Sequence, residues 1–149
     1  MENFATLWTD GSCNNKNPEG MGMGIVIKKG DRTLKYISRC DGVNDKASSN
    51  LAEYLALLQG ISLIIGMKIY NIQCYSDSQL MVKGLIGENR VLDPELLRLK
   101  ELILQIIEIN NLSVGLLWIP REHNKEADKL SKQALKCDPS IYQMQTITI

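Results

Sequence analysis

The sequence predicts an α/β domain in which five strands form one mixed sheet flanked by helices. Two observations support this prediction. Three segments of strand-like composition follow one another in the N-terminal part of the chain, and helical segments then separate the later strands. Strands joined by short turns pair antiparallel, whereas strands separated by a helix are typically parallel. We therefore expect strands 1 to 3 to be antiparallel and strands 1, 4 and 5 to be parallel.

The three early strands are short and rich in apolar, β-branched or aromatic residues, and they cover residues 3–9, 21–29 and 32–39. The first is expected to end where the turn-forming run from Gly11 to Gly20 begins. Gly30-Asp31 then joins the second and third strands, as is typical of a β-hairpin. This arrangement places Asp10 at the end of the first strand.

Helices and strands alternate after the hairpin. The expected helices cover residues 48–66, a short stretch from 77–79 to 84–87, a long stretch from residue 94, and residues 124–136, with strands at 68–76 and 112–119 between them. Asp93 and Pro94 have the residue types of a helix cap and first turn. The final IYQMQTITI favours extended structure, so we expect a domain at 1–138 and a tail at 139–149 that adds an edge strand.

Composition limits the classes of function. The 149 residues carry 17 basic and 17 acidic side chains, so a nucleic-acid partner would need locally clustered basic residues. The four cysteines are scattered without a CxxC pair, which indicates reduced thiols rather than a zinc knuckle or a disulfide framework. No signal peptide or long apolar run is apparent. We expect a cytoplasmic monomer with no membrane or protein partner.

Glu53 is the unusual residue of the expected helix at 48–66. At about 100° per residue it shares a face with apolar and small residues, namely Ala56, Leu57, Gly60 and Ile64. A carboxylate on such a face stays ionised only if a cation or several donors replace its lost water. The alternative is an exposed first-turn position, where the helix dipole favours acids.

Three further acids are expected near Glu53. Asp10 and Asp77 end neighbouring parallel strands, whose carboxyl ends border the binding crevice of an open α/β sheet. Asp128, on the first turns of the last helix, can approach the same edge. Each acid alone also fits a turn, a cap or a solvated helix face. Together they would repel each other unless a divalent cation neutralised them, and all-oxygen ligands favour Mg²⁺ or Mn²⁺.

An ordered set of short motifs resembles ribonuclease H of type 1 over about residues 4–136. The motifs are Thr9-Asp10-Gly11-Ser12-Cys13 with Asn17-Pro18, Asn50-Leu51-Ala52-Glu53, Ser76-Asp77-Ser78-Gln79, and Trp118-Ile119-Pro120 leading to Asn124-Lys125-Glu126-Ala127-Asp128. Their order, spacing and expected strand or helix context all match. The resemblance implies an RNase H-like fold and a metal-dependent endoribonuclease. Such an enzyme hydrolyses the RNA strand of RNA/DNA hybrids and leaves 3′-hydroxyl and 5′-phosphate ends.

The resemblance also implies roles for individual residues. Asp10 would bridge two metal ions, Asp128 would help to hold the ion that activates water, and Glu53 with Asp77 would hold the ion beside the leaving group. The expected substrate contacts are Cys13, Asn17, Ser48, Ser49, Asn50, Gln79 and Asn124. Arg121 and His123 are alternative auxiliary catalytic groups. Arg121 fits relatives with a short loop at this place, and His123 has the chemistry of the family's histidine.

The chain departs from the commoner family pattern in three loops, of which one is the short loop before Asp128, where His123 lies only five residues before the aspartate. The loop after Asp10 is one residue longer, with Glu19 where glycine is usual. No room exists between Asp77 and Asp93 for the basic protrusion that many members use to grip substrate. A lysine stripe at 125, 129, 132 and 136 is either a phosphate contact or a solvated face. Two other functions stay open, namely an integrase- or resolvase-like DNA-processing nuclease and a non-catalytic hybrid-binding module.

Overall fold

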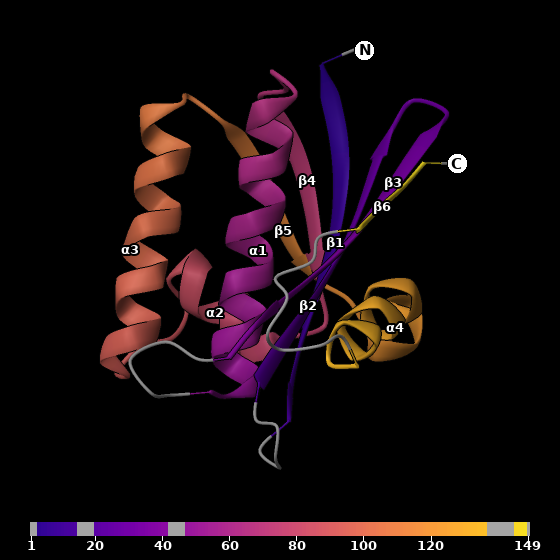
Figure 1. Cartoon of the computed structure of the whole chain (residues 1–149). Coiled ribbons are helices and arrows are strands. Elements are labelled where there is room, and N and C mark those ends of the chain that lie inside the picture. The colour runs from indigo at the N-terminus through magenta and orange to yellow at the C-terminus, as the bar shows by residue number, and fades with distance from the viewer. Residues whose placement is uncertain (1–2, 15–19, 42–46, 137–144, 149) are drawn as a thin grey trace.

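A computed structural model describes residues 3–14, 20–41, 47–136 and 145–148 of the chain. One six-stranded sheet forms its centre, with strand order β5-β4-β1-β2-β3-β6 (Figure 1). The strands are β1 (Phe4–Asn14), β2 (Gly20–Lys29), β3 (Arg32–Cys40), β4 (Asn71–Ser76), β5 (Ser113–Trp118) and β6 (Gln145–Thr148). The helices are α1 (Ser49–Gly66), α2 (Gln79–Ile86), α3 (Pro94–Ile109) and α4 (Lys125–Ala134), with a short 3-10 turn η1 (Arg121–His123).

The strand directions confirm the mixed sheet predicted from the sequence. β1, β2 and β3 pair antiparallel in turn, and β4 pairs parallel with both β1 and β5. β6 adds a sixth strand, antiparallel to β3, within the tail for which an edge strand was expected. The division of the chain at residue 138 stays a prediction, because residues 137–144 lie outside the described residues.

Helices cover the two faces of the sheet unequally. α1, α2 and α3 lie on one face, and α4 lies on the other (Figure 1). The larger apolar core joins α1 and α3 to the sheet and includes Leu7, Ile25 and Ile64. A smaller cluster joins α4 to β2 and β3 through Val26, Ile37 and Leu130. The sheet edge between these helices is where the predicted acids are expected to meet.

β1 is longer than the sequence suggested, and the expected start of a loop at Gly11 is wrong. The parallel pairing of β1 with β4 ends at Thr9, opposite Ser76. The antiparallel pairing with β2 continues to Asn14, opposite Gly20. A strand with two neighbours ends separately against each of them. Asp10 therefore lies just past the carboxyl end of the β1–β4 ladder although it is inside a strand.

Local capping rules explain where the helices begin. The Ser48 side chain accepts a hydrogen bond from Leu51 N at the start of α1, and Asp93 accepts two at the start of α3, with Pro94 as its first residue. β4 begins at Asn71 rather than at Lys68. Lys68 has a positive φ of 61° and its backbone N–H donates to Ile65 O, so it lies in the turn that follows α1.

α1 is the one helix in the described ranges that is long and apolar enough, by length and composition alone, to cross a membrane. Half of that stretch is buried inside the fold. Its buried residues include Leu57, Ile61 and Ile64, which pack in the main core. The apolar character of α1 is therefore explained by its packing against the sheet.

Candidate active site

Glu53 enters the site from the first turns of α1, which lies against β1 at Gly11. Its residue is 8% exposed, and its Oε1 accepts a 2.7 Å hydrogen bond from Gly11 N. A Cβ atom at Gly11 would lie 2.3 Å from Ala52 C and 2.4 Å from Glu53 N. Only glycine allows this approach of helix to strand. Glu53 thus occupies the buried face of the helix, and the alternative of an exposed first-turn position is excluded.

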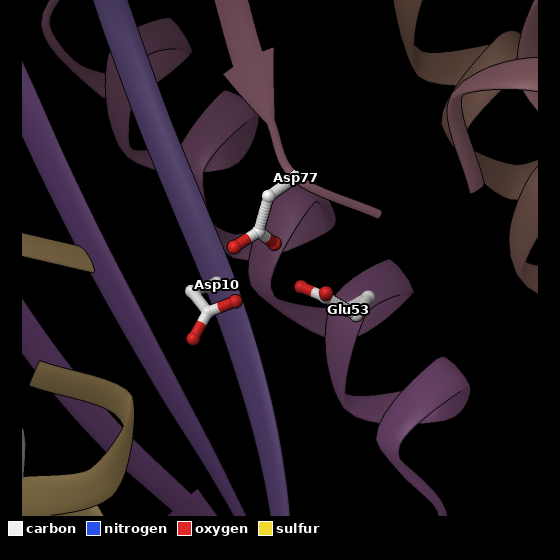
Figure 2. Close-up of side chains that lie close together, drawn as sticks. All are labelled: Asp10, Glu53 and Asp77. Carbon is white, nitrogen blue, oxygen red and sulfur yellow. The ribbon is translucent and has the colours of Figure 1, made fainter. Parts of the chain in front are cut away.

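Asp10, Glu53 and Asp77 come together at the sheet edge. Each offers a carboxylate oxygen, and these three atoms all lie within 4.8 Å of one another. Figure 2 shows the three side chains pointing toward one another, Asp10 from β1, Glu53 from α1 and Asp77 from the chain just after β4. Three converging carboxylates supply the oxygen ligands that Mg²⁺ and Mn²⁺ prefer. These three carboxylates therefore form a group that fits a divalent cation.

Asp128 lies beside this group but outside the 4.8 Å cluster. Its Oδ2 lies 3.0 Å from Lys132 Nζ, and its Oδ1 lies 3.5 Å from Arg121 Nη2. Asp128 nevertheless lines the same cavity as the three other acids. The structure therefore brings all four predicted acids to one cavity and gives Asp128 two cationic partners.

Burial and repulsion determine the charge of the cluster. Burial, followed by the charge of Asp77, raises the pKa of Asp10 to about 8. Burial, followed by the charges of Asp10 and Asp77, raises the pKa of Glu53 to about 9, although the Gly11 hydrogen bond opposes this shift. Burial also acts to raise the pKa of Asp128, but hydrogen bonds with Lys132 and Asp10 and the charges of Lys132 and Arg121 together outweigh this effect, so the pKa is lowered. A bound cation would remove the repulsion and keep Asp10 and Glu53 ionised.

A cavity of about 480 Å³ opens over the acids. Besides the four carboxylates, its lining includes Cys13, Ser49, Arg121 and Lys132. Cys13 and Ser49 were expected to contact substrate, and both line the cavity, so this contact stays a prediction. His123 is exposed in the η1 turn and does not line the cavity. Of the two auxiliary groups, the structure brings Arg121 to the acids.

The other expected substrate contacts occupy varied places. Ser48, Asn50 and Gln79 are exposed at the first turns of α1 and α2. Asn124 is only 2% exposed, and its Nδ2 donates a 2.9 Å hydrogen bond to Thr9 O, so it braces β1 instead of facing solvent. Asn17 lies outside the described residues.

Sequence reasoning missed Ser131 as a part of the site. This residue of α4 is fully buried, and its hydroxyl lies 2.8 Å from Asp10 Oδ2. A serine three residues after Asp128, between the apolar positions of the helix, was the available signal. Lys132 was assigned to a lysine stripe, but its ion pair with Asp128 places it at the edge of the site.

A mixed sheet with carboxylates from β1, α1, the end of β4 and α4 around one cavity defines the RNase H-like class. The reverse transcriptase-like family, which has this fold, matches residues 8–134, and the chain belongs to it. This result confirms the resemblance and the fold predicted from the sequence.

Individual relatives agree with the family. The chain is 28% identical to ribonuclease HI of Halobacterium salinarum over 124 residues, which cover 80% of this chain and 58% of the relative. It is 27% identical to the bifunctional protein Rv2228c of Mycobacterium tuberculosis over 119 residues, again 80% of this chain. The matched part spans about a third of that mycobacterial protein (32%).

Solved structures show the same fold. The crystal structure of RNase H1 from Halobacterium salinarum superposes with a TM-score of 0.75 at 26% identity, covering 89% of this chain and 97% of the other. LC11-RNase H1 in complex with an RNA/DNA hybrid superposes with a TM-score of 0.76 at 26% identity, covering 87% and 95% of the two chains.

Proposed function

We propose that this protein is a metal-dependent endoribonuclease that hydrolyses the RNA strand of RNA/DNA hybrids and leaves 3′-hydroxyl and 5′-phosphate ends. The observation that carries the proposal is the group of Asp10, Glu53 and Asp77, whose carboxylate oxygens lie within 4.8 Å of one another. The similarity of the chain to a halobacterial ribonuclease HI and to an RNase H1 structure in complex with an RNA/DNA hybrid supports this substrate class.

The proposed chemistry divides between bound cations and the residues of this chain. Two Mg²⁺ or Mn²⁺ ions, when bound, supply an activated water and stabilise the leaving oxygen. Asp10, Glu53 and Asp77 hold the cations, and Asp128 at the α4 side completes the ligand set. Gly11 N fixes the Glu53 carboxylate through its 2.7 Å hydrogen bond. The cluster needs no nucleophilic side chain, because water attacks the phosphate.

Arg121 is proposed to orient the phosphate that is cleaved. It lines the cavity, and its guanidinium lies 3.5 Å from Asp128 Oδ1, so its charge faces the acids across the opening. A planar guanidinium can donate two hydrogen bonds to one phosphate. Arg121 therefore supplies charge stabilisation and orientation, whereas it cannot transfer a proton.

Substrate grip is expected to be weak and sensitive to salt. Residues 87–93 alone join α2 to α3, so the family's basic protrusion is missing here. Exposed lysines of α4, including Lys125 and Lys129, and exposed polar groups such as Asn50 and Gln79 remain to contact the backbone of the hybrid. The scattered cysteines without a CxxC pair suit reduced thiols in a cytoplasmic protein, and we propose that the protein acts as a monomer.

A cleavage assay tests the proposal. End-labelled RNA/DNA hybrid, duplex DNA, duplex RNA and single strands are each incubated with Mg²⁺, Mn²⁺ or EDTA. We expect cleavage only in the RNA strand of the hybrid, only with metal, and none by Asp10→Asn. Asp31→Asn, which changes an exposed acid of the β2–β3 hairpin, is the matched control and should cleave normally.

The same assay separates the two other functions. Equal cleavage of duplex DNA would favour an integrase- or resolvase-like nuclease. Tight hybrid binding without cleavage under any metal condition would favour a non-catalytic module.

A further inference from the structure

Ser131 places a buried hydroxyl between α4 and the acids. Its Oγ lies 2.8 Å from Asp10 Oδ2, 2.6 Å from Ser12 Oγ and 2.8 Å from the carbonyl oxygen of Asp128. The residue is fully buried, so water does not compete for these contacts. Three oxygens from β1 and α4 thus converge on a single hydroxyl.

Two glycines of β2 make this approach of α4 possible. Gly24 pairs with Asp10 and Gly22 pairs with Ser12 across the β1–β2 ladder. A Cβ atom at Gly22 would lie 2.1 Å from the backbone oxygen of Ser131, and a Cβ at Gly24 would lie 2.6 Å from its nitrogen. The helix therefore rests on bare backbone directly beside the strand that carries Asp10. The two glycines of the sequence MGMG at residues 21–24 therefore allow this contact.

Counting protons gives the direction of the hydrogen bonds. A serine hydroxyl has one proton, and an ionised carboxylate is the strongest acceptor that Ser131 reaches. When Asp10 is ionised, Ser131 therefore donates to Asp10 Oδ2, and Ser12 donates to Ser131. The result is a chain of two hydroxyls that ends on one oxygen of Asp10. In Figure 2, one Asp10 oxygen points toward Glu53 and Asp77 and the other points away from them.

We propose that Ser131, supported by Ser12, is a positioning residue that holds the Asp10 carboxylate in the orientation in which it binds a divalent cation together with Glu53 and Asp77. The inference rests on the proposed function, because it concerns the same cation site. Groups that hydrogen-bond to a metal ligand fix its orientation, and their loss typically weakens metal binding by about 10- to 100-fold.

Direct measurement of Mn²⁺ binding tests this role without relying on catalysis. The full chain is titrated with Mn²⁺ by calorimetry and by electron paramagnetic resonance of the free ion. We expect Ser131→Ala to raise the Kd for Mn²⁺ about 10-fold or more, because Asp10 loses its hydrogen-bond donor. Ser12→Ala should raise the Kd less, because Ser12 contacts Ser131 and acts on Asp10 only through it. Asp77→Asn removes a carboxylate of the cluster, so its Kd for Mn²⁺ shows the affinity that is expected when the site is lost.

Ser38→Ala is the matched control. Ser38 is also a buried serine, but its hydroxyl donates to Gln59 Oε1, away from the acids. This variant should bind Mn²⁺ as the unchanged protein does. In hybrid cleavage at limiting Mn²⁺, Ser131→Ala should have a lower kcat and an unchanged KM for the hybrid, and about tenfold more Mn²⁺ should restore its rate.

The outcomes separate this inference from the proposed function. Mn²⁺ affinity of Ser131→Ala within twofold of the unchanged protein overturns the positioning role, as does an equal loss in Ser38→Ala. If the unchanged protein binds Mn²⁺ but leaves the hybrid intact, the proposed function fails while the binding comparison still decides the role of Ser131. If the unchanged protein binds no Mn²⁺, both fail.

Discussion

The backbone N–H of Gly11 donates a hydrogen bond of 2.7 Å to Oε1 of Glu53, and this bond depends on the missing side chain at position 11. The backbone of α1 at Ala52 and Glu53 passes over Gly11 so closely that a Cβ atom has no space. The residue after Asp10 therefore sets the distance between β1 and α1. Gly11 therefore fixes the positions of Asp10 and Glu53 relative to each other.

Gly11→Ala should disrupt both the fold and the site. The added methyl group meets backbone atoms 2.3 to 2.6 Å away, which cannot move aside as a side chain can. Overpacking of this kind costs about 1–3 kcal/mol and sometimes more. We expect a lower melting temperature and weaker Mn²⁺ binding, measured by thermal unfolding and by calorimetry.

Gly66→Ala is the control for this substitution. Gly66 ends the same helix, and nothing lies within 4 Å of a Cβ placed there. This variant should melt at the same temperature as the unchanged protein or higher. If Gly11→Ala were equally harmless, the close approach of α1 to β1 would be refuted.

The stability of the metal-free protein should fall as pH rises. The pKa of Asp10 is raised from 3.8 to about 8, and that of Glu53 from 4.5 to about 9, chiefly by burial. Between the ordinary pKa of each group and its raised pKa, from about pH 4 to about pH 9, the folded chain therefore binds more protons than the unfolded chain. The free energy of unfolding decreases as pH rises through this range. Asp128 has a lowered pKa and acts in the opposite sense, but only in acid.

Chemical unfolding in EDTA from pH 5 to pH 8.5 measures this slope. Asp10→Asn should flatten it and raise the melting temperature at pH 8, because one of the repelling charges is gone. Saturating Mg²⁺ should flatten it as well. A free energy of unfolding that rises with pH in EDTA, or an unchanged slope in Asp10→Asn, would contradict the repulsion within the cluster.

Local rules were sufficient for much of the fold. Asp93-Pro94 begins α3, and Ser48 caps α1, because capping depends on neighbouring residues only. The parallel strands followed from the helices between them. The end of β1 could not be predicted in this way, because the β2 partner continues past the β4 partner. That difference arises from pairing with a distant strand.

The site was predicted where a side chain matched both a motif and a helix face, as for Glu53. The burial of Ser131 depends on how α4 docks on Gly22 and Gly24, which no periodicity in α4 encodes. Trp118, the last residue of β5, is 44% exposed, and its Nε1 donates a hydrogen bond to Asp77 O. β5 is an edge strand, so its last residues have a free side that the sequence pattern does not reveal.

Removal of residues 145–149 should lower stability while leaving the site intact. The deletion removes β6, whose four residues pair with Leu34 to Ile37 of β3. The net contribution of each backbone hydrogen bond to the free energy of unfolding is about 0.5–1.5 kcal/mol. We expect a lower melting temperature, and normal hybrid cleavage at low temperature because β2 separates β3 from β1. Deletion of Ile149 alone is the control, and a truncated protein with an unchanged melting temperature would show that the β3–β6 pairing does not stabilise the fold.

Arg121→Ala should lower the turnover of hybrid about 100-fold, as loss of a charged partner of the transition state does. Arg121 lines the cavity 3.5 Å from Asp128, whereas His123 is exposed in η1 and lies outside the lining. His123→Ala should therefore leave both the rate and its pH profile unchanged, and Arg121→Lys should recover part of the rate because it keeps the charge but loses the planar donors.

Arg98→Ala, at an exposed position of α3, is the control for loss of a surface arginine. Initial rates from pH 5.5 to pH 8.5 decide between the two groups: if His123→Ala instead removed an ionisation near pH 6.5 together with most of the activity, the imidazole would be the auxiliary group.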